Sequence, residues 1–311
     1  MIMSGTTQLA HRGAALIMAL LVVALATTLS TTLLFRQDVW LRQVEMQRDL
    51  AQTRLIAGAG IEWARAVLAY DARTSSFDHP GEAWAIQVPP SRVEGGEIGG
   101  EVKDEQAKWN LNNLILVDGS INTANQEAFR RLLRLLELPP GLASTLGDWI
   151  DADSDTSPEG AEDAYYLALS PPYRAANRAL TDVDGLLRVR GFDASVVERL
   201  RPHVTALPGY HRVNVNSASA IMLAALIPDM PPSEIQQLLA QRNKIPFKDF
   251  GDFRSRLPRP EITPNPEQLD TRSRYFNVLI RARYGRAGVT TESLVDRSGA
   301  DWPAIVWQKY E

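Results

Sequence analysis

The first hydrophobic run of the chain covers residues 14–35 and contains no charged residue. As a helix it spans about 33 Å, at roughly 1.5 Å per residue, enough to cross a bilayer core of about 30 Å. Beyond Phe35, apolar residues recur at helical spacing among charged and amide side chains, and no proline interrupts residues 14–79. The pattern predicts one long helix that ends near residues 70–73. A membrane helix followed by a separate surface helix would give the same pattern.

The apolar run admits three interpretations. It is a permanent signal anchor, a secretory signal cut after residues 24–26 (Ala-Leu-Ala), or a prepilin-type segment whose leader ends at Gly13 and is cut before Ala14. His11 and Arg12 precede the run, which favours a cytoplasmic N-terminus and an exported body. These observations alone leave all three interpretations open.

Strand-like patterns lie at both ends of the remaining chain. Residues 84–88 and 97–102 are strand candidates in a turn-rich stretch. Residues 275–285 alternate with a period of two, and residues 289–298 and 303–311 are further strand candidates. The patterns between them predict helices over residues 128–138, 142–150, 161–169, 182–187 and 194–200, and a second helical unit over residues 213–258. We therefore expect an α+β fold. Strands from both ends form one antiparallel sheet on the long helix, and a large all-α insert interrupts that sheet.

Composition excludes several classes of protein. The 311 residues carry a net charge of −4, so no overall basic field draws the chain to nucleic acid. There is no cysteine, which excludes disulfides, thiolate metal sites and cysteine nucleophiles. A hydrophobic content of 45% is that of a globular protein, and the length suits two or three domains.

An acidic loop follows the predicted helix at residues 142–150. Residues 148–163 contain seven carboxylates and neither lysine nor arginine, a crowding that a bound cation would relieve. Asp151, Asp153 and Asp155 take positions 1, 3 and 5 of an EF-hand count with Glu162 at position 12, but Thr156 replaces the expected glycine. We predict an irregular Ca²⁺ loop, and a solvated acidic turn is the alternative. The candidate ligands are Asp148, Asp151, Asp153, Asp155, Glu159, Glu162 and Asp163.

Residues 213–253 resemble the helix-hairpin-helix modules of DNA-uptake proteins, which hold phosphate in a Gly-apolar-Gly turn. Here residues 228–231 read Pro-Asp-Met-Pro, so both glycines are absent and Asp229 would repel phosphate. We expect the hairpin to be structural and the protein to bind no nucleic acid. A membrane-anchored DNA-binding protein for uptake is the alternative function.

Catalysis has little support in the sequence. The four histidines, His11, His79, His203 and His211, are scattered, and no Ser-His-Asp, HExxH, P-loop or GxSxG pattern is present. A calcium-dependent hydrolase is therefore the weakest hypothesis, and we expect the protein not to be an enzyme.

Several short motifs, in their order and spacing, resemble the type II secretion minor pseudopilin K family. They are Arg12-Gly13 before the apolar helix, DEQAKWNLN at 104–112, DWIDAD at 148–153, PYRAAN at 172–177 and VNVN at 213–216. The resemblance implies a pilin-like fold and a structural role at the tip of a periplasmic pseudopilus. It also implies an inner-membrane location with the body in the periplasm, minor pseudopilins of the I and J types as partners, and Ca²⁺ in the helical domain.

The resemblance assigns roles to the N-terminal segment. Prepilin peptidase would cut between Gly13 and Ala14, and Ala14 would be N-methylated. Most pseudopilins carry a glutamate five residues after the cut, which pairs with the N-terminus of the subunit above; here that residue is Met18, as suits a subunit with nothing above it. The expected parts are a leader (1–13), a membrane segment (14–35), the rest of the helix (36–73), the first sheet part (74–120), the helical insert (121–205), a SAM-like helical unit (206–262) and the second sheet part (263–311).

Overall fold

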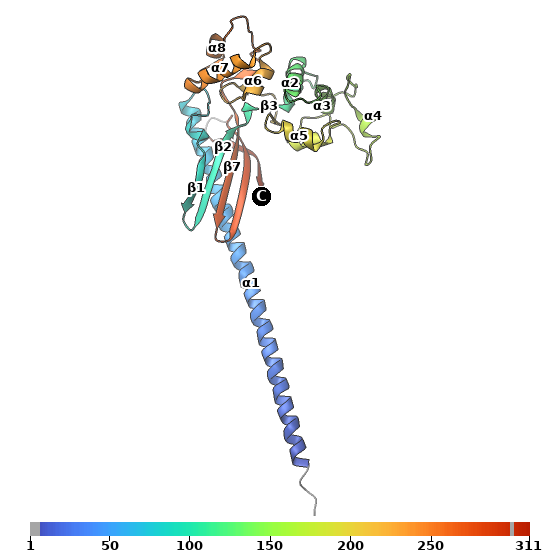
Figure 1. The fold of residues 1–311 in the computed structure, drawn as a ribbon, viewed down its shortest axis with the longest axis vertical. Helices are drawn as coiled ribbons and strands as arrows, with labels where there is room; N and C mark the ends of the chain where they lie inside the picture. The colour runs from blue at the N-terminus through green and yellow to red at the C-terminus, as the bar shows by residue number, and fades with distance from the viewer. Residues whose placement is uncertain (1–6, 299–301) are drawn as a thin grey trace, which may run out of the picture.

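A single long helix organises the protein. The computed structural model describes residues 7–298 and 302–311, with side chains from residue 13 onward. Helix α1 (Thr7–Thr74) runs unbroken from the apolar segment into the body, so the prediction of one helix is confirmed. Its first half stands clear of all other elements (Figure 1). In its second half Ala57, Ile61, Ala64 and Leu68 are buried at the spacing of one helical face, which packs on a sheet.

Five antiparallel strands form that sheet in the order β1-β2-β7-β8-β9. They are β1 (Val88–Val93), β2 (Gly96–Asp104), β7 (Tyr275–Tyr284), β8 (Ala287–Asp296) and β9 (Ala304–Tyr310). Strands β2 and β7 pair from Gly96 with Tyr284 to Asp104 with Phe276, although about half the chain separates them in sequence. The alternation in β7 is confirmed, because Phe276, Val278, Ile280 and Ala282 are buried against α1.

The long segment between β2 and β7 is a mainly helical insert that lies at the end of α1 farthest from the apolar segment (Figure 1). Two parallel strand pairs each close one half of the insert, β3 (Trp109–Asn110) with β4 (Val204–Thr205) and β5 (Val213–Asn214) with β6 (Leu269–Asp270). Its helices are α2 (Thr123–Leu135), α3 (Leu142–Ile150), α4 (Asp163–Tyr166), α5 (Ala194–Leu200), α6 (Ala220–Leu226), α7 (Pro232–Lys244) and α8 (Phe250–Ser255).

The expected boundaries of the insert are too narrow. Strand β3 pairs with β4 and not with the sheet, so the first sheet part ends at Asp104 and not at residue 120. Strand β6 likewise pairs with β5 of the insert, so residues 263–272 belong with the helices. One hydrophobic core runs through both expected helical units, from Trp109 to Leu269, so they form one body.

Three local predictions differ from the structure. Residues 84–88 are not a strand: Ala83–Ala85 form a 3-10 turn, and Trp84 packs edge-on against Phe276 with ring centroids 5.1 Å apart. The helix expected at 161–169 is one turn, Asp163–Tyr166, and that at 182–187 is a 3-10 helix, Val183–Arg188. Both lie in a stretch rich in loops, where packing rather than periodicity decides the backbone.

Buried asparagines hold the loops of the insert together. The Asn112 amide donates to the carbonyl oxygens of Leu180 and Leu207, at 2.9 Å each, and accepts from the Leu180 N–H at 2.8 Å. Asn216 makes an equivalent pair of bonds with the backbone of Phe247. These side chains replace the ladder bonds that irregular backbone lacks, which is why asparagine recurs in these motifs.

Candidate functional site

The apolar half of α1 is the one helix among the described residues that is long and apolar enough to cross a membrane. Its large side chains face outward, with Leu16, Met18 and Leu21 each 64% exposed. The threonines in this segment satisfy their hydroxyl groups internally: Thr28, Thr31 and Thr32 donate to the carbonyl four residues earlier at 2.8 Å. The segment therefore presents no unsatisfied hydroxyl from these threonines to lipid.

The predicted processing residues lie at the start of this segment. The helix begins at Thr7 and passes without a break through Gly13 and Ala14, so the second half of the predicted leader is helical. Residues 1–6 lie outside the described residues. Met18 is one apolar side chain among others on the exposed surface of the helix.

Three of the predicted Ca²⁺ ligands are buried together in the acidic loop. Asp148, near the end of α3, is fully buried, and Asp151 and Glu162 are nearly so. Four of their carboxylate oxygens have no hydrogen-bond partner: Asp148 Oδ1, Asp151 Oδ1 and both oxygens of Glu162. Buried, unpaired carboxylate oxygens carry a large free-energy cost unless a cation binds them.

The raised pKa values of these carboxyl groups also favour a bound cation. Burial and, after it, the carboxylates of Asp153, Asp148 and Glu162 together raise the pKa of Asp151 to about 7. Burial and then the Asp148 carboxylate raise the pKa of Glu162. A Cβ on Gly160 would lie 1.9 Å from Asp148 Oδ2, so only glycine fits beside that carboxylate.

The other four predicted ligands are placed differently. Asp163 accepts from the Arg174 guanidinium at 3.1 Å and from the Ala175 N–H at 3.0 Å, so both of its oxygens are engaged elsewhere. The Glu159 carboxylate points toward Gly141 at the start of α3. Asp153 caps a turn by accepting from the Asp155 N–H at 2.8 Å, and both residues are exposed. The structure thus buries Asp148, Asp151 and Glu162, although their ligand atoms do not all lie within 4.8 Å of one another, and leaves the other four at the margin.

A buried ionic cluster that the sequence did not indicate lies between the sheet and the insert. Arg297 bonds Asp71 at 2.7 Å and both carboxylate oxygens of Asp78 at 2.6 Å, and all three residues are buried. Asp71, Asp78 and Glu82 are the one group of three acidic, histidine or cysteine side chains among the described residues whose ligand atoms lie within 4.8 Å of one another. Because the Arg297 guanidinium pairs with Asp71 and Asp78, the arrangement is an ion-pair network. Sequence spacing gave no sign of it, since Arg297 is 226 residues from Asp71 and 219 from Asp78.

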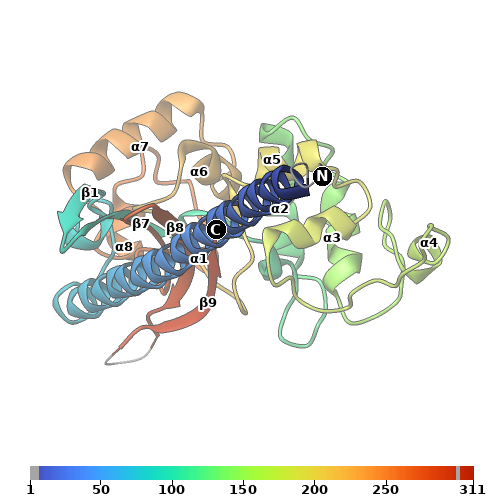
Figure 2. The ribbon, with the colours of Figure 1, turned by 90° about the horizontal axis from the view of Figure 1, so that it is seen from below.

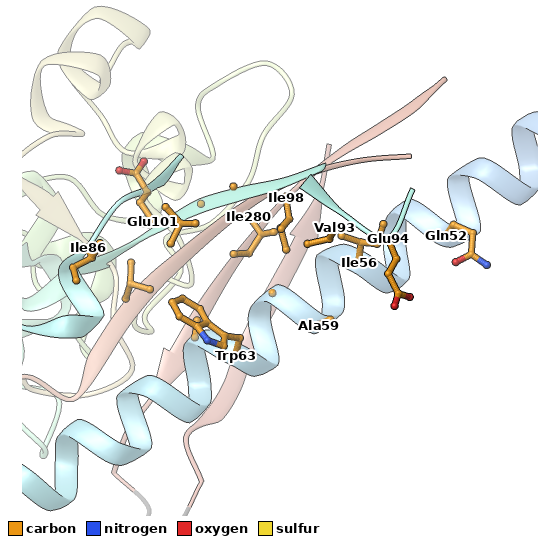
Figure 3. A pocket seen from close by; sticks show the side chains of 16 residues that line it. Gln52, Ile56, Ala59, Trp63, Ile86, Val93, Glu94, Ile98, Glu101 and Ile280 are labelled. Carbon is orange, nitrogen blue, oxygen red and sulfur yellow. The ribbon is translucent and has the colours of Figure 1, made fainter. Parts of the chain in front are cut away.

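An apolar groove of about 570 Å³ runs between α1 and the β1–β2 hairpin (Figure 3). Ile56 and Trp63 of α1 line one wall, and Ile86, Val93 and Ile98 line the other. Trp63 and Ile86 are more than half exposed, so the groove continues onto an apolar surface. Such surfaces on a soluble body mark contacts with other proteins.

The histidines show no catalytic arrangement within the described residues. His79 Nδ1 accepts from the Gly81 N–H at 3.1 Å, and the His211 Nε2 contacts the Pro208 carbonyl oxygen at 2.8 Å. Burial lowers the pKa of both His203 and His211. None of the three imidazole rings hydrogen-bonds a serine or carboxylate side chain in the described part of the chain, which is consistent with packing roles.

The hairpin turn that resembled part of a DNA-binding module is held in place by bonds from the Arg259 guanidinium. Asp229 lies between α6 and α7 with a positive φ of 65°, and its carbonyl oxygen accepts from Arg259. Arg259 also bonds the Glu234 carboxylate at 3.0 Å. The turn presents an acidic residue where a phosphate would have to bind.

Known proteins are similar to this chain over almost its whole length. Two family models described as "Type II secretion system (T2SS), protein K" match residues 107–209 and 213–272, which together are the insert. The Type II secretion system protein K of Pseudomonas aeruginosa is 35% identical over 88% of this chain and 85% of its own length. That of Klebsiella pneumoniae is 32% identical over 96% of each.

The fold also matches a solved structure. A chain of the GspK-GspI-GspJ complex of the type 2 secretion system from enterotoxigenic Escherichia coli superposes with a TM-score of 0.75. The match covers 86% of this chain and 99% of that one, at 24% sequence identity. The likeness confirms the expected arrangement of long helix, small sheet and large insert.

Proposed function

The chain belongs to the type II secretion system protein K family, the minor pseudopilins of that system, and from this premise we propose that it forms the tip of a periplasmic pseudopilus. In this role it supports the export of folded proteins across the outer membrane. The role is structural and involves no catalysis. The observation that carries the proposal is the position of the insert, a bulky body at the end of α1 opposite the membrane segment (Figure 1).

The helix α1 anchors the protein in the inner membrane. We propose a single pass with the N-terminus in the cytoplasm and the sheet and insert in the periplasm, as the flanking basic residues favour. Prepilin peptidase would cut between Gly13 and Ala14, with methylation of Ala14. Met18, the fifth residue of the mature chain, carries no acid to pair with a subunit above it, as suits the apical position.

The partners we propose are the I-type and J-type minor pseudopilins. The matched solved structure is titled as a complex of GspK with GspI and GspJ, and its fold is that of this chain. The apolar groove beside Trp63 and the exposed apolar face of α1 offer surface for such contacts.

We further propose that the acidic loop binds a structural Ca²⁺ through Asp148, Asp151 and Glu162. Their unpaired buried oxygens and hard oxygen chemistry suit this ion. When bound, the ion would offset the repulsion between the three carboxylates and so hold the loop against α3. The helices and loops of the chain do the rest of the positioning.

Co-purification of the detergent-solubilised full chain with the I-type and J-type subunits tests the assembly. We expect a stable heterocomplex, and a chain that stays monomeric in such mixtures would refute the proposal. Mass spectrometry of the mature N-terminus tests processing, with methylated Ala14 expected and an N-terminus at Thr27 contradicting it. The DNA-uptake alternative is not supported, because the residues that suggested it, 213–253, fall within the protein K family match.

A further inference from the structure

The two edges of the sheet differ in their capacity to pair with another strand. Strand β1 forms one edge and carries Pro89 and Pro90, which have no backbone N–H to donate. Its pairing with β2 is also irregular between Val88 and Ser91. Proline and irregularity are the usual devices that prevent an edge from acquiring a further strand.

Strand β9 forms the other edge and carries no proline, and its one irregularity in pairing with β8, between Leu294 and Val295, lies before Gln308 and Tyr310. It contains no proline between Ala304 and Tyr310, and Lys309 is its one charged residue. Within the described ranges, 7–298 and 302–311, no element pairs with its outer side. In Figure 2 the strand lies at the margin of the molecule, below α1 and away from the insert helices.

The register shows which backbone groups point outward. Glu311 and Thr290 exchange both backbone hydrogen bonds, at 2.8 and 3.0 Å, so they form a hydrogen-bonded pair. Tyr310 opposes Thr291 and Gln308 opposes Ser293. Because hydrogen-bonded and non-bonded pairs alternate in an antiparallel ladder, the N–H and C=O groups of Gln308 and Tyr310 face away from β8.

Three large apolar or aromatic side chains of β9 are exposed. Ile305, Val306 and Tyr310 are 36%, 40% and 51% exposed, respectively. The beginning of the strand is held in place: Arg65 of α1 donates to the Pro303 carbonyl oxygen at 2.7 Å and stacks over the Trp302 ring at 5.3 Å. The edge is therefore both open and preorganised, which lowers the entropic cost of pairing.

We propose that the outer edge of β9 is a strand-pairing surface onto which a second pilin-fold subunit, a partner minor pseudopilin, adds a strand. The inference rests on the proposed function, because it supplies the contact by which one partner joins. The added strand would donate to and accept from the outward groups of Gln308 and Tyr310. It would be free of proline and would place apolar side chains beside Ile305 and Val306.

Two substitutions at one position test the pairing. Gln308→Pro removes the outward N–H and leaves the hydrogen bonds to β8 in place. Gln308→Ala is the matched control, because it loses the same side-chain bonds to Thr291 and Tyr310 but keeps the N–H. Affinity for each partner subunit would be measured with the full chain in detergent, alongside the melting temperature.

We expect Gln308→Pro to weaken binding of one partner about tenfold or more and Gln308→Ala to change it by less than about threefold, with similar melting temperatures. Val306→Lys, which keeps every backbone group, should also weaken binding if the proline variant proves unstable. Equal binding by the wild type, Gln308→Pro and Val306→Lys would overturn the edge contact and leave the proposed function intact. A wild-type chain that binds neither partner would overturn both.

Amide hydrogen exchange gives a direct readout. In the complex, exchange at Gln308 and Tyr310 should slow relative to the free chain, while exchange at Ser91 on the opposite edge stays unchanged. Unchanged exchange at Gln308 and Tyr310 in a formed complex would place the partner elsewhere and refute the proposal.

Discussion

The hydroxyl group of Ser273 donates a 2.7 Å hydrogen bond to the Asp104 carboxylate and thereby joins the point where the chain leaves the sheet to the point where it returns. Asn214 of the insert donates to the same carboxylate at 2.9 Å. The Ser273 N–H donates to Asp78, and its carbonyl oxygen accepts from Arg297, each at 2.7 Å. One buried residue thus connects α1, the sheet and the insert, so the orientation of the insert depends on this junction.

Replacing Ser273 by alanine should destabilise the protein. The change removes one donor from the buried Asp104 carboxylate, which costs about 1–3 kcal/mol. Urea denaturation would measure the loss, with Ser91→Ala on the exposed strand β1 as a control expected within about 0.5 kcal/mol of wild type. Equal stability of the two variants would show that the junction contributes nothing.

Stability should depend on pH through the junction carboxyls. Burial raises the pKa of Asp104 from 3.8 to about 6, and burial followed by repulsion from Glu82 raises the pKa of Asp71 to about 6. Both carboxyls bind their protons more tightly in the folded chain than in the unfolded chain. Their contribution to the free energy of unfolding is therefore greatest below about pH 4 and decreases as the pH rises toward about 6.

The pKa values of Asp151 and Glu162 in the acidic loop are also raised, so a substitution is needed to isolate the contribution of the junction carboxyls. Asp104→Asn cannot titrate, and the difference in unfolding free energy between wild type and variant should change between pH 4 and pH 6 and level off above that. Denaturation series at several pH values, in saturating Ca²⁺, would measure the difference. A constant difference across this window would contradict the raised pKa of Asp104.

Arg297→Met should be among the most damaging single substitutions in the body. It leaves Asp71 and Asp78 buried without a counter-charge, which costs about 3–5 kcal/mol. Arg283→Ala, at an exposed position of the neighbouring strand β7, is the control and should cost less than about 0.5 kcal/mol. Chemical denaturation compares the two, and a loss under about 1 kcal/mol for Arg297→Met would refute the assignment.

Ca²⁺ should raise the melting temperature of the wild-type chain, and Asp151→Asn and Glu162→Gln should abolish or greatly weaken this effect. Asp163→Asn serves as the matched control in the same loop, because its carboxylate is engaged by Arg174 and Ala175. Isothermal titration with Ca²⁺ would give the affinities, with Asp163→Asn expected close to wild type. If Asp163→Asn loses Ca²⁺ binding while Asp151→Asn binds Ca²⁺ as the wild type does, the proposed ligand set is wrong.

Periodicity alone was sufficient to place the main elements. The uncharged run at 14–35 and the amphipathic continuation predicted α1, and the alternation of Phe276, Val278, Ile280 and Ala282 predicted the buried face of β7. These predictions succeeded because each depends on which face of a regular element is apolar, a property written in neighbouring residues. The one-turn helix at Asp163 was overestimated because packing, and not periodicity, limits it.

The sequence shows the acidic composition of the loop, but it does not show which of the carboxylates are buried. The EF-hand spacing singled out Asp151, Asp153, Asp155 and Glu162, whereas the fold buries Asp148, Asp151 and Glu162 and turns Asp163 toward Arg174. That choice depends on how the loop returns across α3, which an EF-hand count does not describe.

The sequence by itself determined the membrane helix, the order of sheet and insert, and the acidic loop, because each is a local pattern of polarity or charge. Only the tertiary structure decided that β3 and β6 belong to the insert, that Arg297 pairs with Asp71 and Asp78, and that the proline-free β9 forms the sheet edge opposite β1. These features arise where residues distant in the sequence meet, as Asp104 and Ser273 do. Local sequence carries no record of such meetings, since the pairing of β2 with β7 is what creates them.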